Sequence, residues 1–270
     1  MATTNQIAIL GAGNIGTSIA RGIAQSGEFK AENIVLTRRR IELLDEFKEM
    51  GFQVQKDNKD AVERSNIIIL AVEPHQINGL IQEINPVLSE DKHTLMSVAS
   101  GVDIASIRKQ LDKTITVVRV MPNTAIAIRE SMTCLASDNN GSNSDALEQA
   151  QKIFDTVGET LVIEESQMFA ATALGACGIA FFLRSIRAAS QGGIETGMHA
   201  DQALAIAAQT AKGAASLLQK MKNHPEYEID KVTTPLGCTI AGLNEMEHKG
   251  FSSAIIQGIK MSAEKAGQLY

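Results

Sequence analysis

A glycine-rich turn near the start of the chain, Gly11-x-Gly13-x-x-Gly16, has the spacing that binds the pyrophosphate of a dinucleotide. An apolar stretch, residues 7–10, runs directly into this turn, and a helical pattern follows it. Gly11 permits the tight turn, Gly13 lets the backbone approach the phosphates, and Gly16 lets the helix pack against the strand. The helix then directs its N–H groups and its positive dipole end towards the phosphates. The alternative is a tight turn that binds nothing. We expect cofactor contacts from Gly11, Ala12, Gly13, Asn14, Ile15 and Gly16.

The second predicted strand, residues 34–37, is followed by arginines and not by a carboxylate. In NAD-binding proteins an acidic residue at this position accepts a hydrogen bond from the ribose 2′-OH. A guanidinium instead forms bidentate hydrogen bonds with phosphate. The sequence therefore predicts that NADP(H) is preferred over NAD(H), with Thr37, Arg38 and Arg39 at the 2′-phosphate. Arg40 is assigned to the following helix, and a solvated arginine cluster remains the alternative.

The first half of the chain alternates between short apolar strands and helical patterns. The strands are rich in Ile and Val and apolar on both faces, as buried parallel strands are. This alternation predicts an α/β fold with a Rossmann-like, doubly wound sheet. The predicted strands are residues 7–10, 34–37, 67–72, 94–98, 116–120, 132–136 and 160–163. The predicted helices are residues 15–26, 40–50, 75–84, 104–110 and 145–155.

From residue 164 the composition changes to Ala, Gly, Leu and Gln, and the strand patterns stop. Long helices are predicted over residues 167–191 and 201–221, with Asp201 as the N-cap of the second. Shorter helices are predicted over residues 240–249 and 252–269. The apolar positions of the two long helices are too numerous for a lone subunit to cover on both faces. We therefore predict a dinucleotide-binding domain over residues 1–163 and an all-α dimerisation and substrate domain over residues 164–270.

The composition describes an ordinary globular protein, with 44% hydrophobic residues, 21% charged residues and a net charge of −6. Nothing in this charge suggests nucleic-acid binding. The three cysteines are far apart, which argues against both a disulfide framework and a metal site. The start of the chain leaves no room for a signal peptide, and the longest apolar run, residues 174–183, is too short to cross a membrane. These features predict a cytoplasmic protein without a membrane segment.

Several later segments, together with the glycine turn, resemble the pyrroline-5-carboxylate reductase family. Residues 119–124 read Arg-Val-Met-Pro-Asn-Thr, which matches the family's Arg-x-Met-Pro-Asn-Thr. Residues 232–242 read Val-Thr-Thr-Pro-Leu-Gly-Cys-Thr-Ile-Ala-Gly and resemble its Val-Thr-Ser-Pro-Gly-Gly-Thr-Thr-Ile-Ala-Gly. Residues 71–74 and 97–101 resemble its Ala-Val-Lys-Pro and Ser-x-Ala-Ala-Gly segments. The similarity runs from the first strand to the last helix.

The resemblance implies reduction of 1-pyrroline-5-carboxylate to L-proline by hydride transfer from NADPH, the last step of proline biosynthesis. It implies a small cyclic imine as substrate, and a homodimer through the helical domain, often within a ring of dimers. It places Thr239 near the pyrroline nitrogen, as the catalytic residue, and the substrate carboxylate on backbone N–H groups. The implied substrate residues are Thr234, Gly237, Cys238 and Thr239. The further cofactor residues are Asn58, Ala71, Val72, Pro74, Met121, Pro122 and Asn123.

The chain departs from the family pattern in three places. Residues 175–181 read Gly-Ala-Cys-Gly-Ile-Ala-Phe where the family has Ser-Gly-Ser-Gly-Pro-Ala-Tyr, so three hydroxyl groups are absent. Leu236 occupies a glycine position, and Glu73 replaces a lysine. These departures keep two alternatives open: an NADP(H)-dependent reductase of another cyclic imine, and a catalytically silent NADP(H)-binding protein.

Overall fold

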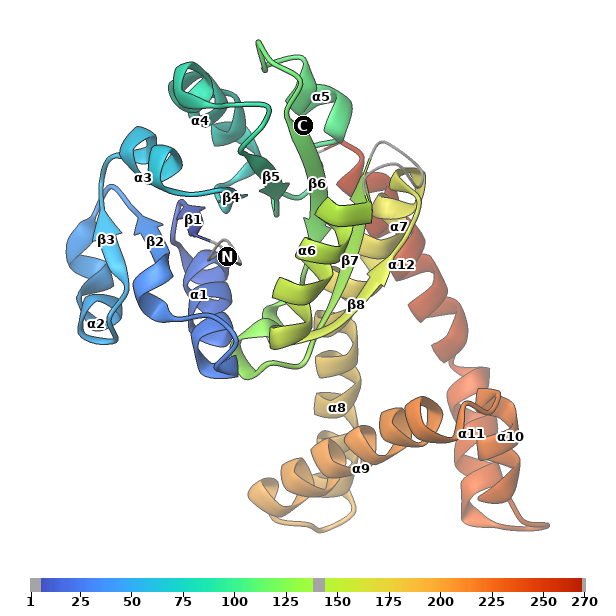
Figure 1. The fold of residues 1–270 in the computed structure, drawn as a ribbon. Helices are drawn as coiled ribbons and strands as arrows, with labels where there is room; N and C mark the ends of the chain where they lie inside the picture. Colours follow the sequence, from blue (N-terminus) through green and yellow to red (C-terminus); the bar gives the residue numbers. More distant parts are fainter. Residues whose placement is uncertain (1–5, 138–143, 269–270) are drawn as a thin grey trace. The chain divides into compact units, whose positions relative to one another are not determined.

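The computed structural model describes residues 6–137 and 144–268, and its ribbon is drawn in Figure 1. The described chain forms two compact units: one runs to Cys177 and includes the chain from Met261 onwards, and the other is Gly178–Lys260. The first unit therefore extends beyond residue 163, where the sequence predicted a domain boundary. The extension occurs because buried Met168, from the next helix, packs with Met121, Cys134 and Ala136 of the sheet.

The first unit is built on an eight-stranded sheet in the order β3-β2-β1-β4-β5-β6-β7-β8. All neighbouring strands are parallel except β6 and β7, which are antiparallel. The sheet confirms the seven predicted strands, with shifted ends at five of them, and adds β3. The strands are β1 Ile7–Leu10, β2 Ile34–Thr37, β3 Gln53–Gln55, β4 Ile67–Leu70, β5 Thr94–Ser97, β6 Thr116–Met121, β7 Ser131–Ser137 and β8 Gly158–Val162.

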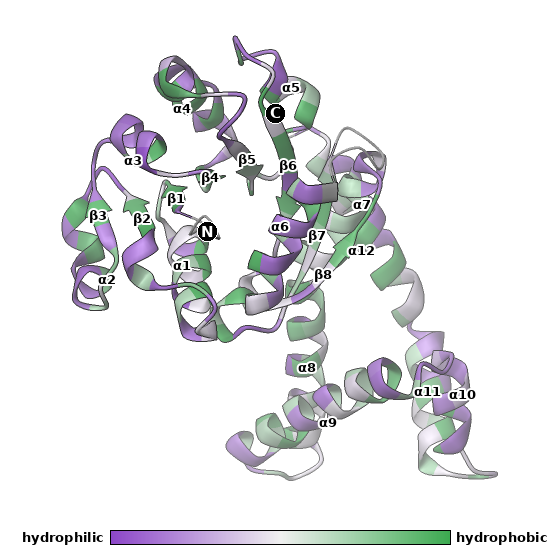
Figure 2. Cartoon of the chain, in the orientation of Figure 1, coloured by the Kyte–Doolittle hydropathy of each residue, from purple (hydrophilic) through white to green (hydrophobic). Residues whose placement is uncertain are grey.

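Helices cover both faces of this sheet, so it has two hydrophobic cores. Ile7 and Ile9 face the core that contains α1 and α6, whereas Ala8 and Leu10 face the core that contains α3, α4 and α5. Figure 2 shows the central strands as hydrophobic along their length, as the two buried faces require. The helices of this unit are α1 Asn14–Ser26, α2 Asp45–Glu49, α3 Asn58–Arg64, α4 Ile77–Ile84, α5 Ile104–Arg108, α6 Ser144–Phe154 and α7 Met168–Ala171. Short 3₁₀ turns include Ile41–Leu44, Pro74–Gln76 and Thr124–Ile128.

The sequence analysis missed β3, α3 and α10, for a common reason. The strand β3 reads Gln-Val-Gln at the edge of the sheet, so its single apolar residue produces no alternating pattern. The helices α3 and α10 are seven residues long and rich in charged side chains. Elements this short and polar carry little hydrophobic periodicity and are recognised only once their neighbours are placed.

The second unit consists of helices. These are α8 Gly178–Glu195, α9 Ala200–Met221, α10 Pro225–Lys231, α11 Cys238–His248 and most of α12 Phe251–Ala266. The prediction of Asp201 as the N-cap of α9 is wrong: the N-cap is His199, and Asp201 lies in the first turn. The carboxylate there is still favourable, because it lies at the positive end of the helix dipole.

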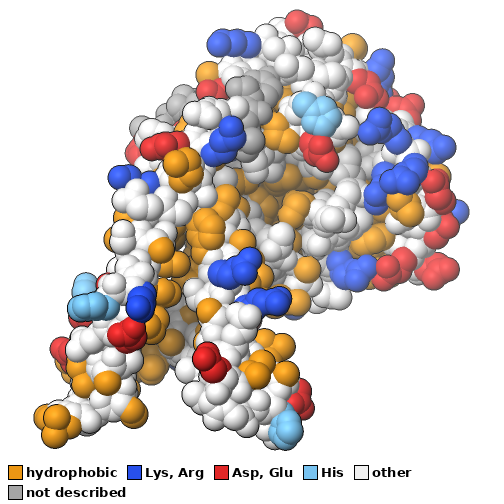
Figure 3. All heavy atoms as spheres, turned by 180° about the vertical axis from the view of Figure 1, so that it is seen from behind, with side chains coloured by type: hydrophobic (Ala, Val, Ile, Leu, Met, Phe, Trp, Pro, Cys, Tyr) orange, Lys and Arg blue, Asp and Glu red, His pale blue; other side chains and the backbone are white. Residues whose placement is uncertain are grey.

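Many large apolar side chains are exposed on the helical part of the chain, as the hydrophobic surface along its helices in Figure 3 illustrates. They include Phe182, Leu183, Leu204, Ile206 and Ile256. The helical stretch Glu165–Glu195 even has the length and hydropathy, 1.6, of a membrane span, and 17% of that window is buried. The apolar surface is therefore longer than the ten-residue run seen in the sequence. Exposed apolar surface of this extent marks an interaction face.

The carboxylate of Asp103 caps α5, and its removal is expected to be measurable. Asp103 Oδ1 accepts a hydrogen bond from Ser106 N at 2.7 Å, and hydrogen bonds from Ser106 lower the pKa of Asp103. We expect Asp103→Ala to reduce the free energy of unfolding by about 1 kcal/mol in urea titrations. Because the folded pKa lies below the ordinary 3.8, this contribution is complete above that pH and disappears as pH falls through the folded value.

Asp103→Asn is the matched control, because its amide oxygen can still accept the hydrogen bond but does not titrate. A wild-type protein that loses no more stability on acidification than Asp103→Asn would contradict the assigned contribution of the carboxylate.

Candidate cofactor and substrate sites

The glycine turn has the conformation that the sequence predicts. Gly11 has φ of +85°, and its N–H and that of Ala12 donate to Thr37 O at 3.2 and 2.8 Å. A Cβ at Gly11 would lie 2.3 Å from Val72 Cγ1, and one at Gly16 would lie 3.2 Å from Ile9 Cγ2. Position 11 therefore requires glycine for reasons internal to the protein, and position 16 accepts a Cβ only if its neighbours shift.

At Gly13 the protein itself leaves room for a side chain. A Cβ there would meet no atom nearer than 3.9 Å, and α1 begins at the next residue without a side-chain cap. The N–H groups of the first helical turn are consequently available to an anion. No protein neighbour therefore explains the glycine at position 13. We infer that it leaves room for a ligand.

A cavity of about 870 Å³ opens beside this turn. It lies at the carboxyl ends of β1 and β2 and beyond β4, where nucleotides bind in doubly wound sheets. Of the predicted cofactor residues, the structure brings together at this cavity Gly11, Gly13, Thr37, Arg38, Arg39, Asn58, Ala71 and Val72. The predicted residues that do not line it are Ala12, Asn14, Ile15, Gly16, Pro74, Met121, Pro122 and Asn123.

Seven further residues that were not among the predicted cofactor residues line the cavity: Arg40, Lys56, Glu73, Gln76, Gly79, Leu80 and Glu83. Arg40 is the N-cap of the 3₁₀ turn Ile41–Leu44 and not part of a continuous helix. Lys56 follows the unpredicted strand β3. The others come from the start of the segment after β4 and from α4. No sequence pattern in α4 indicates contact with a nucleotide.

Thr37 and Asn58 are joined by a hydrogen bond inside this cavity. Thr37 is buried, and its Oγ1 donates to Asn58 Oδ1 at 2.6 Å. Asn58 Nδ2 in turn donates to both carboxylate oxygens of Glu83 at 3.1 Å. The Asn58 amide is therefore held at both ends by the protein, which fixes its orientation before any ligand binds.

The Met121-Pro122-Asn123 segment lies at the end of β6, beside a π-helical turn, Thr172–Cys177. Asn123 is 6% exposed, and its Nδ2 donates to Gly175 O at 3.1 Å while its Oδ1 accepts from Ala125 N at 3.0 Å. Thr172 Oγ1 contacts Met121 Sδ at 3.0 Å. A π-helical turn frees carbonyl groups from the regular helical pattern, and it is frequent at functional sites. The segment thus holds the turn in which this chain departs from the family pattern.

Replacing Asn123 with alanine is expected to lower the free energy of unfolding by about 1–3 kcal/mol, because two partly buried backbone groups, Gly175 O and Ala125 N, lose their partners. The measurement is urea unfolding at one fixed protein concentration, which keeps any linked subunit association constant. Asn123→Asp keeps the acceptor for Ala125 N and removes the donor to Gly175 O. The unfolding free energy that this variant loses therefore reports on the hydrogen bond to Gly175 O alone. Wild-type stability of Asn123→Ala would show that these two hydrogen bonds do not stabilise the fold.

Arg119, two residues before Met121, is buried in the first unit. Its Nη1 lies 3.6 Å from Glu165 Oε1, and its guanidinium lies 5.2 Å from the centre of the Phe169 ring. Burial lowers the pKa of Arg119, whereas Glu165 and Asp103 counteract this effect. Its partner Glu165 also accepts from Ile104 N at 2.7 Å. The family motif here therefore includes a residue that ties the sheet to the segment preceding α7.

The predicted substrate residues lie in the second unit, at the start of α11. Gly237 N donates to Thr234 O at 2.9 Å, which closes a turn immediately before the helix. A Cβ at Gly237 would lie 2.5 Å from Thr234 Oγ1, so this glycine is required by the turn. The helix begins at Cys238 without a side-chain cap. Its first N–H groups are therefore available to a carboxylate.

Leu236, which occupies a glycine position of the family pattern, has a left-handed conformation with φ of +58°. A β-carbon in this region is disfavoured, and glycine is the residue that adopts it without strain. Its side chain is fully exposed within the chain. Leu236 therefore presents an apolar group directly beside the start of α11.

Two family models match separate parts of the chain. Residues 165–269 match a model described as pyrroline-5-carboxylate reductase dimerisation, and residues 6–101 match one described as NADP oxidoreductase, coenzyme F420-dependent. The two matches cover the helical part and the glycine-turn part respectively.

Comparison with known proteins gives similar sequences along nearly all of the chain. The chain is 51% identical to pyrroline-5-carboxylate reductase 1 of Dictyostelium discoideum, over 98% of this chain and 50% of that protein. It is 49% identical to pyrroline-5-carboxylate reductase 2 of the same organism, over 97% of this chain and 92% of that protein. The chain thus spans half the length of the first relative and most of the second.

The fold is similar to that of a solved pyrroline-5-carboxylate reductase from Coxiella burnetii. The TM-score is 0.91 with 28% sequence identity, covering 99% of each chain. Both compact units therefore have counterparts in a solved structure.

Proposed function

The chain belongs to the pyrroline-5-carboxylate reductase family, a family of NAD(P)H-dependent oxidoreductases, and we propose that it reduces 1-pyrroline-5-carboxylate to L-proline, the last step of proline biosynthesis. The 49% identity to a reductase of which the chain covers 92% is the observation that carries this proposal. When bound, the nicotinamide cofactor supplies the hydride that reduces the C=N bond.

The residues of this chain have a limited chemical task. A protonated imine is already electrophilic, so the protein has to bind the substrate, align it and exclude water. The N–H groups of Gly237, Cys238 and Thr239 bind the substrate carboxylate, beside Thr234. The Thr239 hydroxyl hydrogen-bonds near the ring nitrogen. No His or paired carboxylate occurs in these motifs, which is consistent with a reaction that needs no protein base.

NADP(H) is the preferred cofactor in this proposal. The similarity to an NADP oxidoreductase model over residues 6–101 supports NADP binding, and the arginines after β2 support the preference over NAD(H). The glycine turn and its neighbours Ala12, Asn14 and Ile15 hold the pyrophosphate, and Thr37, Arg38 and Arg39 hold the 2′-phosphate. Asn58, Ala71, Val72 and Pro74 line the cofactor cleft, and Met121, Pro122 and Asn123 flank the nicotinamide side.

The working form is a homodimer through the helical unit, with a ring of dimers as the larger assembly. The exposed apolar helices and the match to a dimerisation model over residues 165–269 support this assignment. A second copy of the chain would also cover the apolar stretch Glu165–Glu195 without a membrane. We assign the protein to the cytoplasm, in keeping with its biosynthetic reductase relatives.

The test is to supply 1-pyrroline-5-carboxylate and follow the absorbance of NADPH with the purified protein. Turnover to proline supports the function, and its absence at saturating NADPH would contradict it. The same assay with cyclic imines of other ring sizes separates the alternative substrate, which Leu236 and residues 175–181 favour. A better substrate of another ring size would replace the proposed one. Tight NADPH binding without turnover of any imine would indicate the silent binding protein.

A further inference from the structure

The carboxyl ends of β2 and β3 lie side by side at the rim of the cofactor cavity. In the parallel register of these strands Thr37 is paired with Gln55, and Arg38 N donates to Gln55 O at 3.2 Å. The residue that follows β3 in the chain is Lys56, so it emerges next to the arginines that follow β2. Lys56 lines the same cavity as Arg38, Arg39 and Arg40.

Three of these cations, Arg39, Arg40 and Lys56, form a group that we call the basic triad. All three are exposed, and their side chains form no hydrogen bond or ion pair with another residue within the described parts of the chain. Like charges gathered at one rim repel each other, and an anion between them relieves that repulsion.

The carboxylates that line the cavity, Glu73 and Glu83, form no ion pair with the triad. Glu83 accepts two hydrogen bonds from Asn58 at 3.1 Å, and Glu73 lies 3.4 Å from His75. Both acidic side chains are therefore directed to other partners. The positive charge of the rim is left available to a ligand.

Building on the proposed use of NADPH, we propose that the basic triad extends the 2′-phosphate site assigned above to Thr37, Arg38 and Arg39, and that Lys56 completes it. The pyrophosphate has its own site at the glycine turn, so the rim is left for the second anionic group of NADPH. Arg38 links the rim to the glycine turn, because its Nη1 donates to Ala12 O at 3.1 Å. Lys56 thereby determines specificity between NADPH and NADH.

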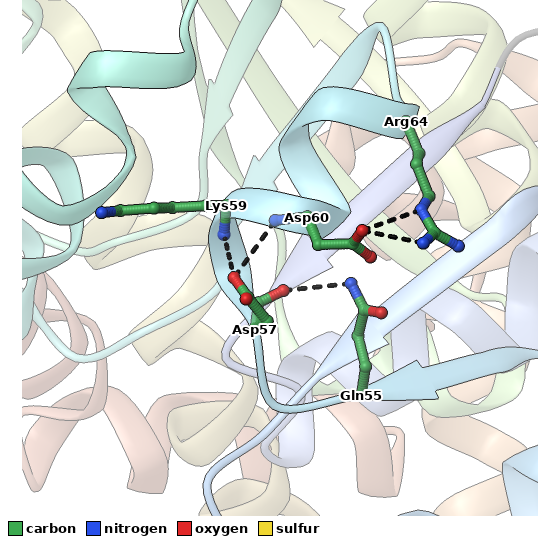
Figure 4. Close-up of polar contacts among 5 residues, drawn as sticks. All are labelled: Gln55, Asp57, Lys59, Asp60 and Arg64. Carbon is green, nitrogen blue, oxygen red and sulfur yellow. Dashed lines mark hydrogen bonds and ion pairs between the residues drawn. The ribbon is translucent and has the colours of Figure 1, made fainter.

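The experiment is calorimetric titration with two probes, adenosine 2′,5′-bisphosphate and AMP, which differ by the 2′-phosphate. It compares the wild-type protein with Lys56→Gln, which removes one charge from the triad. Lys59→Gln is the matched control, because Lys59 is also an exposed lysine, three residues away, and does not line the cavity. Figure 4 shows Lys59 extending away from the side-chain contacts of Gln55, Asp57, Asp60 and Arg64.

We expect Lys56→Gln to weaken binding of the bisphosphate about tenfold and to leave AMP binding unchanged. Lys56→Arg should restore the affinity, since it keeps the charge. Lys59→Gln should bind both probes like the wild type. Equal losses for both probes, or bisphosphate binding by Lys56→Gln like that of the wild type, would overturn the proposal.

These titrations contain no imine and no reducing cofactor, so they are independent of turnover. A protein that binds the bisphosphate through Lys56 and does not reduce 1-pyrroline-5-carboxylate would retain the phosphate site and lose the proposed function. If the wild-type protein reduces the imine and Lys56→Gln binds the bisphosphate as the wild type does, the proposed function stands and the role of Lys56 is wrong.

Discussion

Replacing Gly11 with alanine is expected to weaken NADPH binding by about a hundredfold, because a displacement of about 1 Å in the binding groups has consequences of that size. The new Cβ would lie 2.3 Å from Val72 Cγ1 and 3.0 Å from Ala71 O, and φ of +85° is a glycine conformation. Val72 can rotate away, but the carbonyl of Ala71 belongs to the backbone at the end of β4. The turn itself must therefore move, and it carries the N–H groups of the pyrophosphate site with it.

Calorimetric titration with NADPH measures this loss, and urea unfolding measures the accompanying strain. Two other glycines separate its causes. Gly27→Ala introduces the same left-handed strain at φ of +77°, with open space around the Cβ and no contact with the cavity. It should lower the unfolding free energy by about 1–2 kcal/mol and leave NADPH affinity unchanged.

Gly13→Ala tests the opposite case. Its Cβ meets no protein atom within 3.9 Å, so stability should be kept while NADPH binding weakens. If Gly11→Ala bound NADPH like the wild type, the turn would not be the pyrophosphate site. If Gly13→Ala bound NADPH like the wild type, the inference that Gly13 leaves room for a ligand would be wrong.

Replacing Thr239 with alanine is expected to lower kcat/KM for 1-pyrroline-5-carboxylate by about tenfold to a hundredfold. The hydroxyl would lose one hydrogen bond to a charged partner, which contributes about 1.5–3 kcal/mol. The prediction concerns the transition state, so NADPH affinity should stay the same. Steady-state kinetics with both substrates varied measures the effect, and an unchanged rate would show that Thr239 has been assigned the wrong role.

Two variants control this result. Thr239→Ser keeps the hydroxyl and should retain most of the activity. Thr233→Ala removes a hydroxyl from the same loop, but Thr233 Oγ1 donates to Asp230 O at 3.1 Å and serves the loop itself. A loss of activity in Thr233→Ala as large as that in Thr239→Ala would point to loop distortion and not to a contact with the substrate.

The sequence predicted that the helices expose an apolar face, but it did not predict how far along the helix that face extends. The sequence shows a ten-residue apolar run, whereas the helix extends over Glu165–Glu195, and 17% of its most hydrophobic window is buried. Residues that are adjacent on a helix surface are three or four apart in the chain, so polar residues interrupt the run without interrupting the face. The expectation of a partner subunit therefore rests on the apolar face of the helix and not on the ten-residue apolar run in the sequence.

The nicotinamide-side motif illustrates a second limit. Met-Pro-Asn is recognisable as a family motif, and the resemblance assigns Asn123 to the cofactor. The structure adds that Asn123 is buried and binds Gly175 O and Ala125 N. The partner Gly175 lies 52 positions away, within a π-helical turn that no local pattern predicts. Such a contact becomes visible only when the strand and the helix are placed together.

The sequence by itself determined the doubly wound sheet, the glycine turn and the arginines that follow β2. These features are local: apolar runs define buried strands, and a glycine conformation is required wherever a turn is as tight as the one at Gly11. Only the tertiary structure decided which charges share the rim of the cavity. Lys56 follows a strand of three residues that has no hydrophobic signature, and the pairing of β3 with β2 brings it beside Arg38. That pairing joins residues distant in the chain, so it depends on the folded sheet and not on any local pattern.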